Sequence, residues 1–347
     1  MPPLTIHTLD PNADHRAWDD FANTHPRGSI YHLSGWRDVI WKVFRQEQIY
    51  LQATDSAGEV AGILPMVRQK SRIFGHRLLS MPYFNYGGAL GTSNEVEIAL
   101  MEHAGELATA SGASSVEFRD MITRESRWPC RDEKLLMILD LPETPDELFK
   151  AIGTKRRTRI RRAGKENPEI LRGSLELLDD FYTVFAITMR DLGTPVYSAR
   201  FFAEILRAFP DETEIISIRL NNEPVSAGFL IKHGDLLQIP WAGTLRKVNR
   251  LAINMFLYWK VLEKAIEQGC RQFDFGRTTV GSGTHEFKTQ WGSQPHQMYW
   301  HYWLAPGTER PKLNPDNPKY KRAISTWQKL PVPITKIIGP HLVKNLP

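Results

Sequence analysis

Apolar residues recur at two spacings along the chain, and each spacing predicts one kind of element. Apolar positions three or four residues apart predict amphipathic helices. Such helices are expected at residues 36–44, 95–111, 148–163, 175–192, 200–208 and 251–266. Short apolar or alternating runs bounded by turn residues predict strands. Strands are expected at residues 49–54, 60–67, 115–119, 135–141, 213–220, 225–231, 236–242, 271–275 and 297–304.

Turn and stop residues separate these elements. Gly112 and Gly269 follow predicted helices, and glycine readily ends a helix. The pair Asn221-Asn222 predicts a tight hairpin turn between two strands. In the strand at residues 271–275, polar and aromatic residues alternate, which predicts that Asp274 faces outward.

Both halves of the chain share one order of predicted elements: hairpin, helix, glycine stop, strand, strand. Helices that lie between strands indicate mixed α/β sheets, so the sequence predicts two tandem α/β units. We expect a first domain at residues 1–143 and a second at residues 144–305. Residues 306–347 are rich in Pro and Lys and are expected to pack on the first domain or lie on a membrane surface. A ligand crevice is expected between the units or where two strands splay apart.

The composition is that of an ordinary globular protein, with 41% hydrophobic and 24% charged residues. Cys130 and Cys270 form neither a disulfide framework nor a metal-ligand pattern, which suits a reducing compartment and predicts no metal site. The first residues lack the basic and apolar regions of a signal peptide. No apolar run approaches the roughly 20 residues that cross a bilayer. A cytoplasmic protein is therefore expected.

One segment concentrates positive charge although the net charge is only +5. Residues 155–165 hold seven Lys or Arg and no acid. Because the planar arginine fork suits phosphates, this predicted helix is a candidate to contact a tRNA backbone or a diphosphate. The candidate contacts are Lys155, Arg156, Arg157, Arg159 and Arg162. A solvated helix face, with Ile152, Ile160 and Ala163 on the core, is the alternative. No DNA-docking motif is evident.

Three segments, in order along the chain, resemble the FemAB-like peptidyltransferases. They are the basic helix at Ala151–Ala163, the helix and strand at Val261–Gly276, and the Phe-Lys-x-x-aromatic-Gly motif within Glu286–Gly292. Residues 317–347 and the glycine-rich run after Phe275 resemble the branch that accompanies exosortase (PEP-CTERM) and exopolysaccharide systems. The resemblance implies two acetyltransferase-like (GNAT-type) domains, an aminoacyl-tRNA donor and a peptidoglycan-precursor amine as acceptor.

The stretch Phe273–Gly292 carries the candidate chemistry. Acyl transfer to an amine needs a base for the amine proton and a positive or donor group at the developing oxyanion. The resemblance assigns the motif lysine to Lys288, and Asp274 and His285 are further catalytic candidates. The alternatives are a surface lysine on a glycine-rich loop, a structural ion pair between Asp274 and Arg277, and an ordinary loop histidine. No Ser-His or Cys-His pair is evident, which favours direct attack in a ternary complex.

Further residues are candidates for substrate binding. Around the loop before the predicted helix at residues 251–266 these are Trp241, Arg246, Arg250 and Asn254, and Arg277 follows the later strand. Acetyl-CoA-dependent relatives of the fold carry a glycine-rich pyrophosphate loop before that helix. Its absence here argues against ordinary CoA binding but leaves a side-chain phosphate clamp open.

The first half offers aromatic candidates for the acceptor. Trp36, Tyr83, Asn85 and Tyr86 present rings and polar groups to a sugar or base, with ordinary loop packing as the alternative. The loop at residues 81–88 lacks the Pro-Arg-Gly-type sequence usual in the family. This departure argues against a UDP-muramyl-pentapeptide acceptor.

The leading hypothesis is a FemAB-like acyltransferase that forms an amide on an amine of a peptidoglycan or exopolysaccharide precursor. We expect no tightly bound cofactor; the expected donor is a charged tRNA or an acyl-CoA or acyl carrier, and the acceptor is a glycan or peptide precursor. If the acceptor is lipid-linked, the tail would make peripheral contact with the inner membrane surface. A second hypothesis is an N-acyltransferase that uses acyl-CoA or an acyl carrier. A third is a non-catalytic polyanion- or RNA-binding protein, which predicts salt-dependent binding without product.

Overall fold

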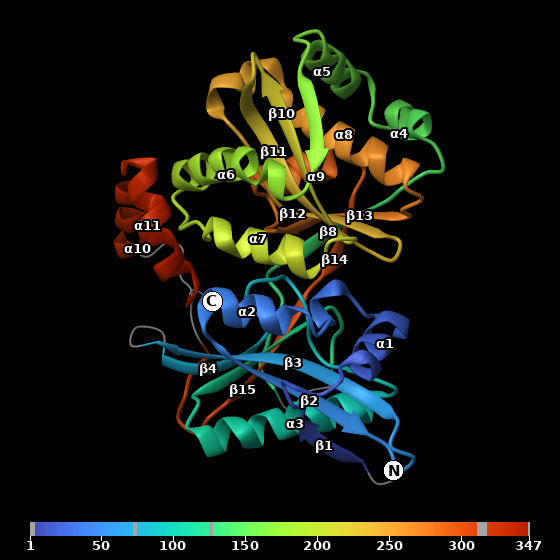
Figure 1. Cartoon of the computed structure of the whole chain (residues 1–347), viewed down its shortest axis with the longest axis vertical. Coiled ribbons are helices and arrows are strands. Elements are labelled where there is room, and N and C mark those ends of the chain that lie inside the picture. Colours follow the sequence, from blue (N-terminus) through green and yellow to red (C-terminus); the bar gives the residue numbers. More distant parts are fainter. Residues whose placement is uncertain (1–3, 72–74, 125–127, 311–317, 346–347) are drawn as a thin grey trace. The chain divides into compact units, whose positions relative to one another are not determined.

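The computed structural model describes residues 4–71, 75–124, 128–310 and 318–345 and divides into two compact units (Figure 1). The first unit comprises residues 1–135, 297–312 and 345–347, and the second comprises residues 136–296 and 313–344. Each unit is built around its own sheet.

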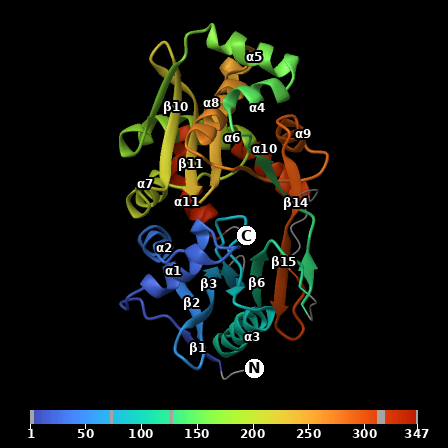
Figure 2. The same ribbon diagram turned by 90° about the vertical axis from the view of Figure 1, so that its right-hand side faces the viewer.

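A mixed eight-stranded sheet forms the first unit. Its strands are β1 (Thr5–Thr8), β2 (Glu47–Thr54), β3 (Val60–Ser71), β4 (Gly75–Ser80), β5 (Leu90–Gly91), β6 (Ser115–Asp120), β7 (Cys130–Arg131) and β15 (Tyr299–Leu304). The spatial order is β1-β2-β3-β4-β6-β15-β7, and β5 pairs with β3. β4 and β6 run parallel, and the other pairs are antiparallel. β15 comes from late in the sequence and lies between β6 and β7 (Figure 2).

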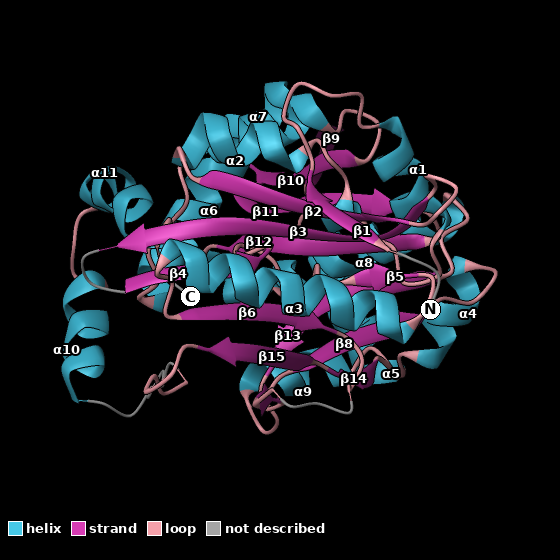
Figure 3. Cartoon of the chain, turned by 90° about the horizontal axis from the view of Figure 1, so that it is seen from below, coloured by secondary structure: helices cyan, strands magenta, loops and turns pink. Residues whose placement is uncertain are grey.

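Helices cover both faces of this sheet. They are α1 (Arg16–Thr24), α2 (Trp36–Phe44) and α3 (Asn94–Ser111). From β2, Ile49 and Leu51 join the core with α3, which crosses one face of the sheet (Figure 3). Tyr50 points to the other face, where its ring stacks on Trp18 of α1 at 5.0 Å. Because successive strand residues face opposite sides, β2 needs apolar residues at both sets of positions.

A seven-stranded sheet forms the second unit. Its strands are β8 (Leu135–Asp140), β9 (Glu169–Gly173), β10 (Thr213–Leu220), β11 (Glu223–His233), β12 (Leu236–Thr244), β13 (Gln272–Thr278) and β14 (Gln294–Gln297), in the order β14-β8-β13-β12-β11-β10-β9. β12 and β13 run parallel, but their pairing covers only Leu236–Gln238 with Gln272–Asp274. The two strands therefore diverge beyond Gln238 and Asp274.

Helices also lie on both faces of the second sheet. The helices of the second unit are α4 (Pro145–Ala151), α5 (Thr154–Gly164), α6 (Leu178–Leu192), α7 (Ala199–Ala208), α8 (Ile253–Glu267), α9 (Gly283–Thr289), α10 (Pro318–Trp327) and α11 (Val332–Val343). Both α6 and α8 pack on β11 and β12. Since every residue of β11 from Val225 to Ile231 is buried, helices cover both sides of that strand.

The predicted mixed α/β architecture of two tandem units is confirmed. α3 ends at Gly112, which has a φ of 69°, as the sequence predicts. Asn221 and Asn222 both have positive φ, 51° and 65°, and join β10 to β11. Positive φ at both central residues is the requirement of a tight hairpin turn that matches the twist of the strands.

Three local predictions were wrong. The single helix predicted at residues 148–163 is two helices, because Gly153 adopts a φ of 80° between α4 and α5. The glycine-rich crossing contains the short helix α9, which Ser282 begins by accepting the His285 N–H at 3.2 Å. Asp274 does not face outward but is only 2% exposed, because β13 lies inside the sheet between β8 and β12.

The two units differ from the expected domains, residues 1–143 and 144–305, because one strand of each expected domain joins the sheet of the other unit. β8 joins the second sheet, where the Leu141 N–H donates to the Arg271 carbonyl at 2.8 Å. β15 joins the first sheet, although its sequence follows the second unit. Pairing between residues far apart in the sequence determines which sheet each strand joins. Local sequence patterns do not show this pairing.

The C-terminal extension divides between the units: the Arg310 guanidinium donates to the Cys130 carbonyl of the first unit at 2.7 Å, whereas α10 and α11 belong to the second unit. α11 lies against α6, and the Arg190 guanidinium on α6 donates to the Leu330 carbonyl at 3.2 Å. The Gln328 amide donates to the Asp191 carbonyl at 3.0 Å. The extension therefore has specific polar anchors at the end of α6.

Candidate active site

The divergence of β12 and β13 brings the end of β13 next to α9. Gly276 on β13 has a φ of 80°, which a residue with a side chain rarely adopts. Hydroxyl groups then tie the following loop, with the Thr278 Oγ1 lying 3.1 Å from the Ser282 Oγ and 3.0 Å from the Thr284 Oγ1. The loop is therefore fixed, and it places Lys288 of α9 over the end of β13.

Lys288 is a buried lysine. Its residue is 8% exposed, and its Nζ donates to the carbonyl oxygens of Gly276 and Arg277, each at 2.8 Å. An ammonium has three N–H donors, so these two bonds leave a third for a substrate oxygen. Burial lowers the pKa of Lys288 to about 8. The alternative of a surface lysine on a loop does not fit this position.

Asp274 of β13 interacts electrostatically with this ammonium. Its Oδ1 accepts the Gly276 N–H at 2.6 Å. Burial raises the pKa of Asp274 to about 6, and the charge of Lys288 opposes that rise. At neutral pH the carboxylate and the ammonium are therefore both mainly charged, and each favours the charged form of the other. The exposed Arg277 also lowers the pKa of Lys288 by repulsion.

Aromatic side chains line the region around Asp274 and Lys288, although they were not among the site residues predicted from the sequence. Phe287 and Trp291 on either side of Lys288 contact the ring of Tyr258, with centroids 4.9 Å and 6.4 Å apart. Trp291 also contacts Phe275 of β13. These rings exclude water, which explains the pKa shifts of the charged pair. The signal was present in the Phe-Lys-x-x-aromatic-Gly motif, whose two aromatic positions are Phe287 and Trp291.

His285 and the residues around the start of α8 are less tightly organised. His285 lies half-buried on α9, about one turn before Lys288. Asn254 accepts the Thr244 hydroxyl at 3.2 Å, while Arg246 is exposed and donates to the Asp191 carbonyl at 2.9 Å. Arg250 is exposed. Arg246 and Arg250 are therefore accessible to a phosphate-bearing ligand.

Trp241, in contrast, is part of the core. It is buried in a cluster of rings with Phe201, Phe202 and Phe229, at centroid distances of 5.6, 5.2 and 5.4 Å. Because other rings contact Trp241 on several sides, it packs in the core of the second unit, and these contacts account for its burial.

The basic segment divides into anchored and exposed cations. Ile160 and Ala163 of α5 are buried, as the alternative interpretation expected. The Arg156 guanidinium donates to the Ile152 carbonyl at 2.7 Å, and Arg157 donates to the Thr154 hydroxyl at 2.9 Å. The exposed cations are Lys155, Arg159, Arg161, Arg162 and Lys165.

The aromatic candidates of the first unit lie mostly in its core. Trp36 is fully buried and donates its Nε1–H to the Ile30 carbonyl at 2.7 Å. Tyr83 and Tyr86 are buried too, and the Tyr83 hydroxyl donates to the Gln46 side chain. The Asn85 carbonyl accepts the Trp300 Nε1–H at 3.2 Å. These contacts favour the packing interpretation of the loop at residues 81–88.

A buried arginine holds this loop in place. The Arg119 Nη1 donates to the carbonyl oxygens of Met81, Pro82 and Phe84 at 3.4, 2.5 and 2.6 Å. Its guanidinium also lies 4.4 Å from the ring centroid of Trp300. The loop is therefore a rigid part of the first unit.

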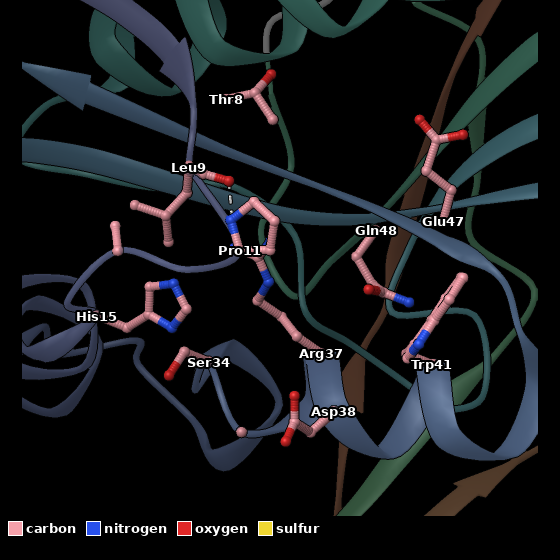
Figure 4. A pocket seen from close by; sticks show the side chains of 12 residues that line it. Thr8, Leu9, Pro11, His15, Ser34, Arg37, Asp38, Trp41, Glu47 and Gln48 are labelled. Carbon is pink, nitrogen blue, oxygen red and sulfur yellow. Dashed lines mark hydrogen bonds between the residues drawn. The ribbon is translucent and has the colours of Figure 1, made fainter.

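The first unit also has an open pocket with a volume of about 660 Å³ (Figure 4). Trp41 of α2 lines it and is 50% exposed. The carboxylates of Asp38 and Glu47 and the ring of His15 line it as well. Arg37 closes the floor by donating to the Leu9 carbonyl at 3.3 Å. The Arg45 guanidinium lies 5.4 Å from the Trp41 ring centroid, and the half-exposed indole with nearby carboxylates is suited to a sugar ring that carries an amine.

Neither a metal centre nor a membrane span is found in the described part of the chain. No group of three or more His, Cys, Asp or Glu among these residues has the geometry to hold a metal ion. None of the helices described is long and apolar enough to cross a membrane.

Two tandem units, each a mixed sheet between helices, with a diverging parallel strand pair in the second, define a tandem acetyltransferase-like fold. Residues 154–289 match the acetyltransferase (GNAT) domain family. That match contains both Asp274 and Lys288, and it supports an acyltransferase activity for the chain.

Solved structures share the fold over most of the chain. FemX has a TM-score of 0.66 at 15% identity, and the similarity covers 87% of this chain and 97% of FemX. L-PGS from Bacillus licheniformis has a TM-score of 0.56 at 14% identity, with 96% and 99% covered. A tandem GNAT protein from the clavulanic acid biosynthesis pathway has a TM-score of 0.51 at 12% identity, with 88% and 100% covered. No curated protein matches the chain. The resemblance to the FemAB-like fold is thereby confirmed.

Proposed function

We propose that this chain forms an amide by transferring an aminoacyl or acyl group to an amine of a cell-envelope precursor. The observation that carries the proposal is the buried Asp274–Lys288 pair at the diverging end of β13. Such a pair is costly to bury and gives no advantage to a protein that only binds polyanions. The match of residues 154–289 to an acetyltransferase domain supports the same reaction class.

In the proposed step, the amine nitrogen attacks the carbonyl carbon of the donor. The ester or thioester bond then breaks, the new amide loses one proton, and the leaving alcohol or thiol gains one. The third N–H of Lys288 stabilises the oxyanion of the tetrahedral intermediate. Asp274 keeps Lys288 charged and correctly placed, and His285 accepts the amine proton directly or through water.

The donor remains one of two chemical classes. The exposed cations of α5, among them Lys155, Arg159 and Arg162, support a charged tRNA. The acetyltransferase-domain match supports acyl-CoA or an acyl carrier, although the residues before α8 lack a glycine-rich pyrophosphate loop. Isothermal titration with CoA and with charged tRNA separates the two, since only the true donor class should bind tightly.

The first unit would bind the acceptor. The pocket around Trp41, with Asp38 and Glu47 at its walls, suits an amine-bearing glycan or peptide precursor, including one linked to a lipid. The enzyme would then act at the cytoplasmic face of the membrane, in an exopolysaccharide or peptidoglycan pathway. In an activity assay, Trp41→Ala should raise the KM for the acceptor and leave kcat nearly unchanged, whereas an unchanged KM would remove this pocket from the proposal.

Lys288→Ala tests the reaction itself. Removing a donor to an oxyanion typically lowers turnover by about 10²- to 10³-fold, so we expect kcat to fall by at least about a hundredfold. Products of purified enzyme with candidate donors and acceptors would be identified by mass spectrometry. Lys264→Ala, which changes a half-buried lysine on α8, is the matched control and should keep full turnover. Full activity of Lys288→Ala would refute the assignment.

A further inference from the structure

Large apolar side chains are exposed together on the C-terminal helix α11. We call this set the isoleucine face; it consists of Ile334, Ile337, Ile338 and Leu342. The described residues include nine exposed large hydrophobic side chains, and four of them belong to this face. Ile337 is 69% exposed, more than any of the other eight. The clustering indicates a contact surface, because single exposed apolar residues are normally scattered.

Packing of α11 forces this face outward. The buried side of α11 consists of Thr335, Gly339 and Val343, spaced four residues apart. A Cβ at Gly339 would lie only 2.8 Å from the Val196 carbonyl oxygen, so the helix backbone presses directly on the second unit. Lys336 lies 5.0 Å from the ring centroid of Tyr182 on α6.

α11 therefore buries small residues and exposes large ones. An amphipathic helix on a globular protein usually does the reverse. The large residues are thus available to something outside the chain, and α11 stands at the side of α6 in the second unit (Figure 1).

The C-terminal extension carries charge of a single sign from residue 318 onward. Residues 318–347 contain six Lys or Arg and neither Asp nor Glu, while the whole chain has a net charge of only +5. The rest of the chain is therefore close to neutral. Among the described side chains, Arg322, Lys329 and His341 are exposed in this segment.

We propose that the isoleucine face docks α11 on the surface of an anionic phospholipid bilayer. Apolar side chains enter the boundary between headgroups and acyl chains, and the cations around them contact lipid phosphates. α11 has twelve residues, so it would lie in the plane of the surface over about 18 Å rather than span the bilayer. This docking surface lies apart from Asp274 and Lys288 and does not depend on the proposed reaction.

Binding of the full chain to vesicles tests the docking. We expect the protein to float with vesicles of phosphatidylcholine and phosphatidylglycerol but much less with vesicles of phosphatidylcholine alone. Added salt should weaken the binding, because it screens the cations. Ile337→Glu removes a large apolar contact and adds a repelled charge. We expect it to lower the partition coefficient by at least about tenfold, equivalent to about 1.4 kcal/mol.

Leu175→Glu is the matched control, since Leu175, like Ile337, is an exposed large aliphatic residue of the second unit but lies outside the isoleucine face. It should bind vesicles like the unchanged protein, and both variants should keep the same melting temperature. Failure of the unchanged protein to bind anionic vesicles would overturn the docking, as would an equal loss in both variants. Self-association that Ile337→Glu abolishes in the absence of vesicles would instead identify the face as a contact between two copies. Turnover on a soluble acceptor is measured separately, so the outcome leaves the proposed reaction unaffected.

Discussion

Asp274 and Lys288 are both removed from water, and each makes it less costly to keep the other charged. Burying two opposite charges seldom stabilises a protein compared with apolar residues of similar volume. Here Lys288 is held by two backbone carbonyls and Asp274 by the Gly276 N–H, so the pair is oriented as well as charged. That orientation is the property which oxyanion stabilisation requires.

The two pKa values predict how activity should depend on pH. The proposed roles require an ionised Asp274 and a protonated Lys288. We therefore expect kcat/KM to rise as pH passes the Asp274 pKa of about 6 and to fall as pH passes the Lys288 pKa of about 8. The maximum lies near neutral pH.

Asp274→Asn distinguishes the two limbs of this profile. The rise on the acid side should disappear, and the fall on the alkaline side should move to lower pH, because the carboxylate no longer favours the ammonium. Asp211→Asn, which changes an exposed acid of the same unit, should keep the original profile. Two unchanged limbs in Asp274→Asn would contradict the assigned roles.

Helices and strands that are determined by nearby residues in the sequence could be predicted. α3 and its stop at Gly112 follow from helical periodicity and a glycine, and the β10–β11 hairpin follows from its Asn-Asn turn. α9 was missed because Gly281 precedes it and Gly283 is its first residue, and both glycines suggest a loop. The break between α4 and α5 depends on the positive φ of Gly153, which the sequence permits but does not require.

The candidate site likewise has some features that the sequence predicts and others that depend on the fold. The motif lysine Lys288 could be selected from the sequence, but its burial depends on how α9 folds over β13. Asp274 was placed outward because alternation alone cannot show that strands lie on both sides. Trp36 belongs to the apolar face of α2, so its burial could have been predicted from the sequence. Trp41 lies outside that face, and its indole is exposed.

The loop at residues 81–88 gives a prediction at the level of an element. Arg119→Lys keeps the charge but loses the planar fork that reaches the carbonyls of Met81, Pro82 and Phe84. We expect the free energy of unfolding to fall by about 2 kcal/mol, since buried carbonyls lose their donor. Urea unfolding measures this, and limited proteolysis should show faster cleavage in the loop.

Arg68→Lys is the control for this change, because Arg68 is a half-buried arginine on β3 with a single ion pair to Glu47 at 3.0 Å. It should unfold like the unchanged protein. Equal stability of the two variants would mean that Arg119 does not hold the loop.

At the scale of the molecule, the exchange of strands determines which fragments can fold. A fragment of residues 135–297 keeps all seven strands of the second sheet, whereas a fragment of residues 144–305 lacks β8 and leaves β13 and β14 without their shared neighbour. We expect the first fragment to be soluble and to unfold cooperatively, and the second to aggregate through its open strand edges. Size-exclusion chromatography and circular dichroism compare them, and equal folding of both fragments would contradict the topology.

The position of β15 also has a consequence for synthesis on the ribosome. β6 ends at Asp120, but its neighbour β15 begins only at Tyr299, after the whole second unit. At typical translation speeds of about 5–20 residues per second, the nascent chain waits roughly 10–40 s before β6 can be paired on that side. During that time all strands of the second sheet except β14 can emerge and pair. The first sheet is therefore expected to be completed only after most of the second sheet has formed, and its open edge at β6 is where a chaperone would have to bind.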